Sequence, residues 1–133
     1  MKNSQKTILV AAILGAFAVI LGAFGAHKLA SIPSVNLSAY QTGIQYHFYH
    51  TIALLSLGIW QSLHPDNSWI KRAALCFIIG IGCFSGSLYL LATKEILHLQ
   101  SFTSILGPLT PIGGLFFILG WGFIALSASK KPL

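Results

Sequence analysis

The stretch from Thr7 to Ala26, TILVAAILGAFAVILGAFGA, decides the fold class. Its twenty residues carry no ionisable side chain, and at a rise of about 1.5 Å per residue such a helix crosses the roughly 30 Å hydrocarbon core of a membrane. The run is too long for the apolar part of a typical signal peptide, and further apolar segments follow it. We therefore expect it to be the first of several membrane spans.

The remaining composition agrees with a membrane protein. Of the 133 residues, 55% are hydrophobic and 8% are charged, whereas soluble domains carry about 25% charged residues. This charge content cannot cover a water-soluble surface, which excludes soluble nucleotide-binding folds, metallohydrolases and nucleic-acid readers. The sequence predicts an all-α, integral membrane four-helix bundle that forms one domain over residues 1–133. Its spans are expected at about 7–26, 46–63, 73–93 and 108–127.

The second span has a polar approach. Residues 36–45 precede it and could already be helical, with Asn36 as the N-cap because an asparagine side chain accepts a hydrogen bond from the first turn. His47 and His50 would then lie just inside the span.

Lysine and arginine counts predict the orientation. Two cations fall on one side of the membrane, Lys28 and Lys94. Six fall on the other side: Lys2, Lys6, Lys71, Arg72, Lys130 and Lys131. The positive-inside rule therefore places both termini in the cytoplasm of a bacterium, or in the matrix if the protein is organellar.

Small residues indicate where helices pack closely. In the first span they recur every three or four residues as one stripe, which predicts that this helix is the central packing helix. A GxxxG pair lies in the third span, and prolines and glycines open the fourth. The expected packing residues are Gly15, Gly22, Gly25, Gly82, Gly86, Pro108, Pro111 and Gly113.

The entry to the fourth span, LGPLTPIGG, supports two interpretations. Unpaired N–H groups at a helix start could hold an anionic headgroup or a carboxylate. Alternatively, the prolines and glycines only shape a tight return of the chain from the loop.

The predicted topology gathers polar residues in the non-cytoplasmic half of the bundle. The first and third spans end there, and the second and fourth begin there. The candidate ligand-binding residues in this layer are His27, Tyr46, His47, His50, Ser87, Tyr89 and Thr110.

The histidines of this layer have three interpretations. His27, His47 and His50 could supply nitrogens to zinc, or one of them could ligate haem. They could instead handle a proton or a ligand, as intramembrane histidines often do. The favoured interpretation is structural, with each imidazole bonding neighbouring hydroxyl or backbone groups. No carboxylate is near enough in sequence to act as a base, so we predict no catalytic residue, no metal and no cofactor.

Aromatic residues are arranged as a membrane-boundary belt would require. Three tryptophans are expected at the cytoplasmic boundary and four tyrosines at the outer one. These residues are Trp60, Trp69, Trp121, Tyr40, Tyr46, Tyr49 and Tyr89.

Four strings carry a family resemblance: LGAFGAHKL, YQTGIQYHFYHTIALL, CFSGSLYLLA and LGPLTPIGG. Together they resemble the small four-helix inner-membrane proteins of the YgdD/YwdK type, a domain-of-unknown-function family with a relative in animal mitochondria. The resemblance implies a four-span bacterial inner-membrane protein and no particular reaction. The positions it singles out are Gly22, Gly25, Ala26, His27, Tyr46, His50, Gly86, Ser87, Gly107, Pro108, Pro111 and Gly113.

Three functional hypotheses follow. The leading one is a non-enzymatic membrane protein that acts through lipid, small-ligand or membrane-protein binding at the outer polar cluster. The second is an oligomeric transporter or channel component, and the third is a metal- or haem-binding redox protein. Expected partners are membrane lipid and a second copy or another membrane protein, and no nucleic acid.

The predicted orientation can be tested by cysteine-accessibility labelling in intact cells. Single cysteines introduced near Ser34 and Gln100 should react with an impermeant reagent from the periplasm. Cysteines at Asn67 and Ser129 should react only after the cells are opened. Labelling at Asn67 from outside would reject the orientation.

Overall fold

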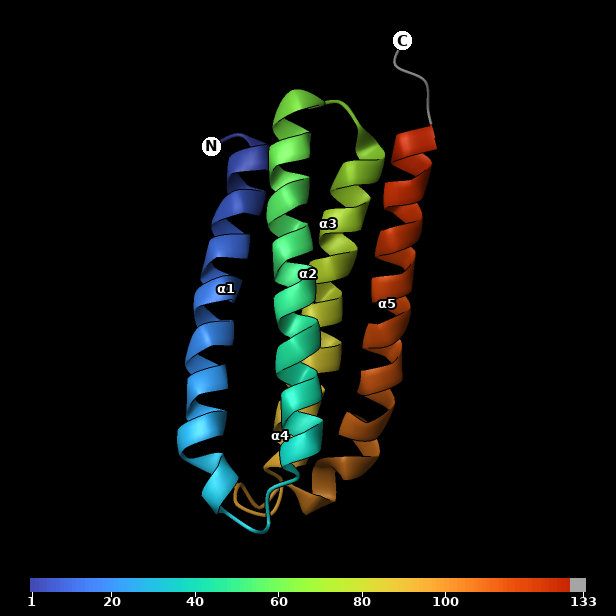
Figure 1. The fold of residues 1–133 in the computed structure, drawn as a ribbon. Helices are drawn as coiled ribbons and strands as arrows, with labels where there is room; N and C mark the ends of the chain where they lie inside the picture. The colour runs from blue at the N-terminus through green and yellow to red at the C-terminus, as the bar shows by residue number, and fades with distance from the viewer. Residues whose placement is uncertain (130–133) are drawn as a thin grey trace.

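The computed structural model of the chain describes residues 1–129, which form four long helical rods (Figure 1). A π-helical turn, η2, joins α3 to α4 in one rod, and 3₁₀ turns lie in two of the connections. The elements are α1 (Asn3–His27), η1 (Leu29–Ser31), α2 (Leu37–Leu63), α3 (Ser68–Gly80), η2 (Ile81–Ser85), α4 (Gly86–Ala92), η3 (Gln100–Phe102) and α5 (Thr103–Ser129). The predicted all-α four-helix bundle is confirmed.

The central helix of the bundle is α2. It contacts α1 on one side and the rod of α3, η2 and α4 on the other, while α3 packs along α5. Within the described residues, α2 is the long helix against which α1 makes its extensive contacts. The prediction that the first span is central is therefore wrong, because its small-residue stripe faces a single neighbour.

Polarity explains why α2 occupies the middle. By length and composition, three helical segments within residues 1–129 are apolar enough to cross a membrane: Asn3–Ser31, Ser68–Ala92 and Gln100–Ser129. The second rod, α2, is as long but more polar, and its polar side chains lie inside the bundle. The buried ones are His47, His50, Thr51 and Gln61. A central position keeps these groups away from the hydrocarbon.

The start of α2 changes the depth of its histidines. Asn36 caps the helix as expected, since its side chain accepts a hydrogen bond from the backbone N–H of Ala39 at 3.1 Å. The helix thus begins nine residues before Tyr46, and His50 lies thirteen residues from either end. His50 is therefore at mid-height of α2 and not in the outer layer to which the sequence assigned it.

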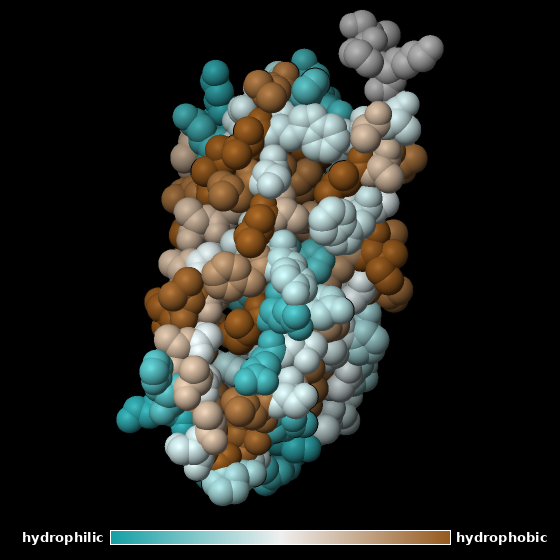
Figure 2. All heavy atoms as spheres, viewed as in Figure 1, coloured by the Kyte–Doolittle hydropathy of each residue, from teal (hydrophilic) through white to brown (hydrophobic). Residues whose placement is uncertain are grey.

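The two ends of the bundle differ in charge. The start of α1, the α2–α3 turn and the end of α5 lie together, which we call the termini end. It carries Lys2, Lys6, Lys71 and Arg72, whereas Lys28 and Lys94 lie at the opposite end. Lys130 and Lys131 lie outside the described residues. Figure 2 shows most of the strongly hydrophilic surface toward the two ends, with a smaller hydrophilic area between them.

Asn67 connects two helices at the termini end. Its side-chain oxygen accepts hydrogen bonds from the backbone N–H groups of Trp69 and Ile70, which caps α3. Its side-chain nitrogen donates to Ser127 Oγ on α5 at 2.8 Å. One amide thus ends the α2–α3 turn and fixes α5 against it.

Helix α5 begins earlier than predicted. It starts at Thr103, so Pro108 and Pro111 lie inside the helix and do not open it. The segment LGPLTPIGG therefore does not present a helix N-terminus, and the anion-binding interpretation of that entry is wrong. The prolines fit because their fixed φ is helical, although each lacks the N–H that would bond the carbonyl four residues earlier.

The close-packed glycines agree only in part with those that the spacing indicated: Gly25 and Gly113 are confirmed, and the other four predicted glycines are not close-packed. A Cβ on Gly82 or Gly86 would meet nothing within 4 Å, so the GxxxG pair faces open space. On Gly15 and Gly22 it would make only ordinary contacts, at 3.5 and 3.7 Å. The glycines whose added Cβ would collide with a neighbour are Gly25, Gly43, Gly58, Gly80, Gly113 and Gly120. At Gly113 the collision is with the Phe84 backbone, which brings α5 directly against η2.

Gly113→Leu should destabilise the bundle, whereas Gly122→Leu on the same helix should not. A side chain at Gly113 would push α5 off η2, and overpacking of this kind costs about 1–3 kcal/mol. Gly122 is the matched control because a Cβ there meets nothing within 4 Å. Melting temperatures in detergent measure the difference, and equal values would contradict the close approach of α5 and η2.

Candidate functional site

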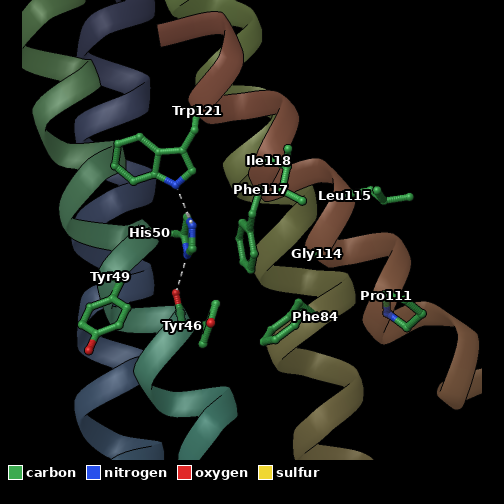
Figure 3. A pocket seen from close by; sticks show the side chains of 10 residues that line it. All are labelled: Tyr46, Tyr49, His50, Phe84, Pro111, Gly114, Leu115, Phe117, Ile118 and Trp121. Carbon is green, nitrogen blue, oxygen red and sulfur yellow. Dashed lines mark hydrogen bonds between the residues drawn. The ribbon is translucent and has the colours of Figure 1, made fainter. Parts of the chain in front are cut away.

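His50 lies at mid-height of the bundle, where two hydrogen bonds and ring stacking hold its side chain (Figure 3). Its Nδ1 lies 2.8 Å from the backbone carbonyl oxygen of Tyr46, and its Nε2 lies 3.2 Å from Nε1 of Trp121. The ring also stacks on Phe117, with ring centroids 3.5 Å apart and an interplanar angle of 6°. Three helical positions on two helices therefore hold one imidazole.

The partners of His50 define its tautomer. A carbonyl oxygen only accepts and an indole N–H only donates, so Nδ1 carries the proton and Nε2 is the acceptor. This arrangement requires the neutral ring, because a proton on Nε2 would face the N–H of Trp121. The structural interpretation expected hydroxyl or backbone partners. One partner of His50 is a backbone carbonyl of α2 itself, and the other is an indole N–H on α5.

A groove opens beside His50, between α2 and α5 (Figure 3). It has a volume of about 650 Å³, and aromatic side chains form most of its walls. The lining residues are Tyr46, Tyr49, His50, Phe84, Pro111, Gly114, Leu115, Phe117, Ile118 and Trp121. The groove is open on its outer side, so its occupant can enter sideways from the membrane.

A second hollow of about 400 Å³ extends the groove toward the termini end. The two hollows share Tyr49 and Trp121, which lie on opposite walls. The residues that line the extension are Tyr49, Ile52, Ala53, Ser56, Leu57, Trp60, Trp121 and Ile124. Together the two hollows form one continuous groove along α2 and α5, which we call the α2/α5 groove.

His47 belongs to a different part of the interior. Its Nδ1 lies 2.9 Å from the hydroxyl of Tyr89 on α4, the backbone of Leu14 on α1 lies near the ring, and Nε2 forms no hydrogen bond within residues 1–129. Tyr89 also packs against Tyr40, with ring centroids 5.1 Å apart, and Tyr40 donates to the Leu21 carbonyl oxygen at 2.7 Å. His47 thus links α1, α2 and α4 and does not line the α2/α5 groove.

The other candidate residues lie at separate places. Ser87 and Thr110 bond each other, with their oxygens 2.6 Å apart, and join α4 to α5. His27 is exposed at the last position of α1. The predicted cluster is therefore not one site: His50 and Tyr46 line the groove, His47 and Tyr89 form a pair, and His27 stands apart.

A metal site is not formed by these histidines. Across residues 1–129, no three His, Cys, Asp or Glu side chains come together as a metal ion would require. His27, His47 and His50 in particular do not converge, because His47 faces α1 and α4 while His50 faces α5.

Trp121 and Phe117 are the site residues that the sequence analysis missed. Trp121 was assigned to the boundary belt, but it lies eight residues before the end of α5, about 12 Å inside it at 1.5 Å per residue. This distance from the end of the helix was the signal that could have placed Trp121 inside the membrane and not at its boundary. The outer tyrosine belt is likewise wrong for Tyr40, which is 3% exposed, and for Tyr89, which bonds His47 inside the bundle.

The fold and the groove define a class: a compact multi-pass membrane protein with a membrane-facing groove. Residues 21–114 match the family described as "Protein of unknown function (DUF423)". The membrane protein YwdK of Bacillus subtilis is 40% identical over 124 residues, which cover 92% of this chain and 95% of the relative. A Haemophilus influenzae membrane protein is 38% identical over 132 residues, 98% of each chain.

The inner membrane protein YgdD of Escherichia coli is 35% identical over 129 residues, 96% of this chain and 92% of the relative. All three relatives bear the family name UPF0382. The chain belongs to this DUF423/UPF0382 family, as its four sequence strings indicated, and it is a multi-pass protein of the bacterial inner membrane. No solved structure matches it significantly.

His50→Ala and Trp121→Phe should each lower the melting temperature in detergent. Each change leaves one hydrogen-bonding group without its partner inside the membrane, which costs about 1–3 kcal/mol. Trp60→Phe is the matched control, because Trp60 lies near the end of α2 and packs on the exposed His64. If His50→Ala melts as wild type does and yet abolishes the phenotype of a deletion strain, the ring handles a ligand or proton and the structural role is wrong.

Proposed function

We propose that this protein is a non-enzymatic membrane protein that binds a lipid in the α2/α5 groove. The observation that carries the proposal is the groove itself, an open furrow at mid-height of the bundle. It is lined by apolar and aromatic side chains, and its volume of about 650 Å³ falls within the roughly 300–1,000 Å³ of small-molecule sites. The names of the relatives contain no enzymatic activity, which agrees with the proposal.

The depth of the groove limits the class of occupant. His50 lies at the middle of α2, so the surrounding medium is lipid hydrocarbon, and a water-soluble ligand would have to cross half the membrane to arrive there. A hydrocarbon chain is already present at that depth. The outer opening lets such a chain enter without any separation of the helices.

The chemistry of the groove also favours a hydrocarbon chain. The most polar groups in its wall, the His50 ring and the Trp121 N–H, already bond each other. They therefore present no unpaired donor or acceptor that would recognise a polar ligand. The Tyr46 ring packs against Phe84 in a tilted arrangement, with ring centroids 4.8 Å apart and an interplanar angle of 37°, so it forms part of an apolar wall.

The polar cluster that the sequence predicted contributes to this function indirectly. His47 bonds Tyr89 and joins α2 to α4, while Ser87 bonds Thr110 and joins α4 to α5, so these two pairs hold the groove walls in register. In this proposal they are structural residues, while Tyr46 and His50 contact the lipid.

Ile118→Trp should weaken lipid binding by about tenfold, corresponding to 1.4 kcal/mol, because the larger ring would fill the groove. Leu119→Trp is the matched control, since Leu119 is exposed on α5 but does not line the groove. Native mass spectrometry of the protein in mild detergent measures retained lipid. Equal retention by the two variants would reject the site.

A second outcome would also overturn the proposal. If a photo-crosslinker at Ile118 joins two chains and captures no lipid, the groove holds a second copy of the protein. The oligomeric transporter hypothesis would then replace the lipid-binding one.

A further inference from the structure

A polar cavity lies at the termini end, apart from the α2/α5 groove. It has a volume of about 400 Å³ and is formed where the start of α1 meets the end of α2. Its lining residues are Met1, Lys2, Asn3, Ser4, Gln61, Ser62 and Pro65. Five of these seven are polar, whereas the groove is lined mainly by aromatic and aliphatic side chains.

Gln61 presents a buried donor to this cavity. The side chain is only 3% exposed, and its oxygen Oε1 accepts a hydrogen bond from the Thr7 hydroxyl at 2.9 Å. With the amide held in this way, the two N–H bonds of Nε2 are left over, and no acceptor among residues 1–129 bonds them. This nitrogen is not fully enclosed but reaches the cavity, where a ligand that accepts hydrogen bonds can bond it.

The first turn of α1 adds further donors. The backbone N–H of Lys2, the N-cap, donates to Gln5 Oε1 at 2.8 Å, and the N–H groups of Asn3 and Ser4 lack intrahelical partners because they precede the first complete turn. Ser4 is itself buried, at 8% exposed. The first turn contains no acidic residue that would neutralise the positive end of the helix dipole.

The side chains at the termini end carry a net positive charge, the same sign as the N-terminal end of the α1 dipole. Lys2 lines the cavity, and Lys6, Lys71 and Arg72 lie at the same end of the bundle. Asp66 is the single acidic residue there among the described residues, and it is exposed in the α2–α3 turn. The cavity thus gathers donors from an ammonium group, free backbone N–H groups and the Gln61 amide, beside the carbonyl end of α2.

We propose that this cavity binds a phosphate group, supplied by the headgroup of an anionic phospholipid in the leaflet at the termini end. A phosphate diester offers several acceptor oxygens, which the donors of α1 and Gln61 can share from two sides. The cavity lies at the membrane surface, where anionic headgroups are concentrated. Free inorganic phosphate has the same chemistry and is distinguished by the experiment.

The test uses the full-length protein in a neutral detergent. Short-chain phosphatidylglycerol, short-chain phosphatidylcholine and inorganic phosphate are titrated separately, and binding is followed by the shift in melting temperature. We expect saturable stabilisation by phosphatidylglycerol and little by phosphatidylcholine. Comparable stabilisation by inorganic phosphate would assign the same site to free phosphate, and no stabilisation by either anion would overturn the proposal.

Charge variants separate the cavity from general surface attraction. A lysine near a membrane surface contributes about 1 kcal/mol to anionic-lipid attraction, roughly fivefold in affinity. Lys6→Gln removes a charge one helical turn from Lys2 but outside the cavity lining. We expect Lys2→Gln to weaken phosphatidylglycerol binding by about tenfold or more, and by more than Lys6→Gln does. Equal effects of the two variants would overturn the site.

Two further variants test the neutral donors. Gln61→Leu removes the buried amide and should abolish the saturable component. Asn3→Pro removes one free N–H and suits the first helical position, because Lys2 before it already has an extended backbone with φ −65° and ψ 155°. If Gln61→Leu fails to fold, Asn3→Pro carries the test alone, and unchanged affinity in Asn3→Pro would contradict binding at the α1 terminus.

Discussion

A polar group inside a membrane is stabilised by a partner within the protein, and α2 carries more buried polar side chains than the other rods. His47, His50, Thr51 and Gln61 are all buried, and all except Thr51 form a side-chain hydrogen bond. The partners come from every other rod: Thr7 on α1, Tyr89 on α4 and Trp121 on α5. Because hydrocarbon offers no alternative hydrogen bonds, these contacts determine which helices surround α2 and at what height. The central position of the most polar helix is therefore the constraint from which the packing order follows.

The number and type of helices could be predicted because they depend on long uncharged runs, which are local features of the sequence. The N-cap at Asn36 could also be predicted, since capping chemistry concerns one side chain and the next turn. The packing order could not, because the spacing of small residues shows that a close approach is feasible but not which neighbour uses it. Gly82 and Gly86 have the motif spacing and face open space, whereas Gly113 and Gly120, seven residues apart, receive Phe84 and Phe77.

The site was predicted in part for a similar reason. His47 and His50 are three residues apart, and the sequence assigned both to one outer polar layer. In a bundle with neighbours on both sides, a separation of about 60° around the axis turns one ring toward α1 and α4 and the other toward α5. Trp121 was assigned to the boundary by residue type, although its depth in α5 makes it a partner for the midpoint of α2. The sequence pattern did not show how far α2 and α5 extend beyond their apolar segments, and this extension sets the depth of His50 and Trp121.

The same packing bears on whether one chain could conduct or transport. Gly80 receives Phe117, and Gly120 receives Phe77, so α3 and α5 interlock in both directions around the height of His50. Leu54, Ile70, Phe77 and Ser85 are under 2% exposed, which leaves the interior at these positions filled by side chains. The free volume of the α2/α5 groove lies on the outside of the bundle, where the surrounding lipid has access. A transport pathway through this protein would therefore have to be built between copies along that groove, whereas lipid binding requires one copy alone.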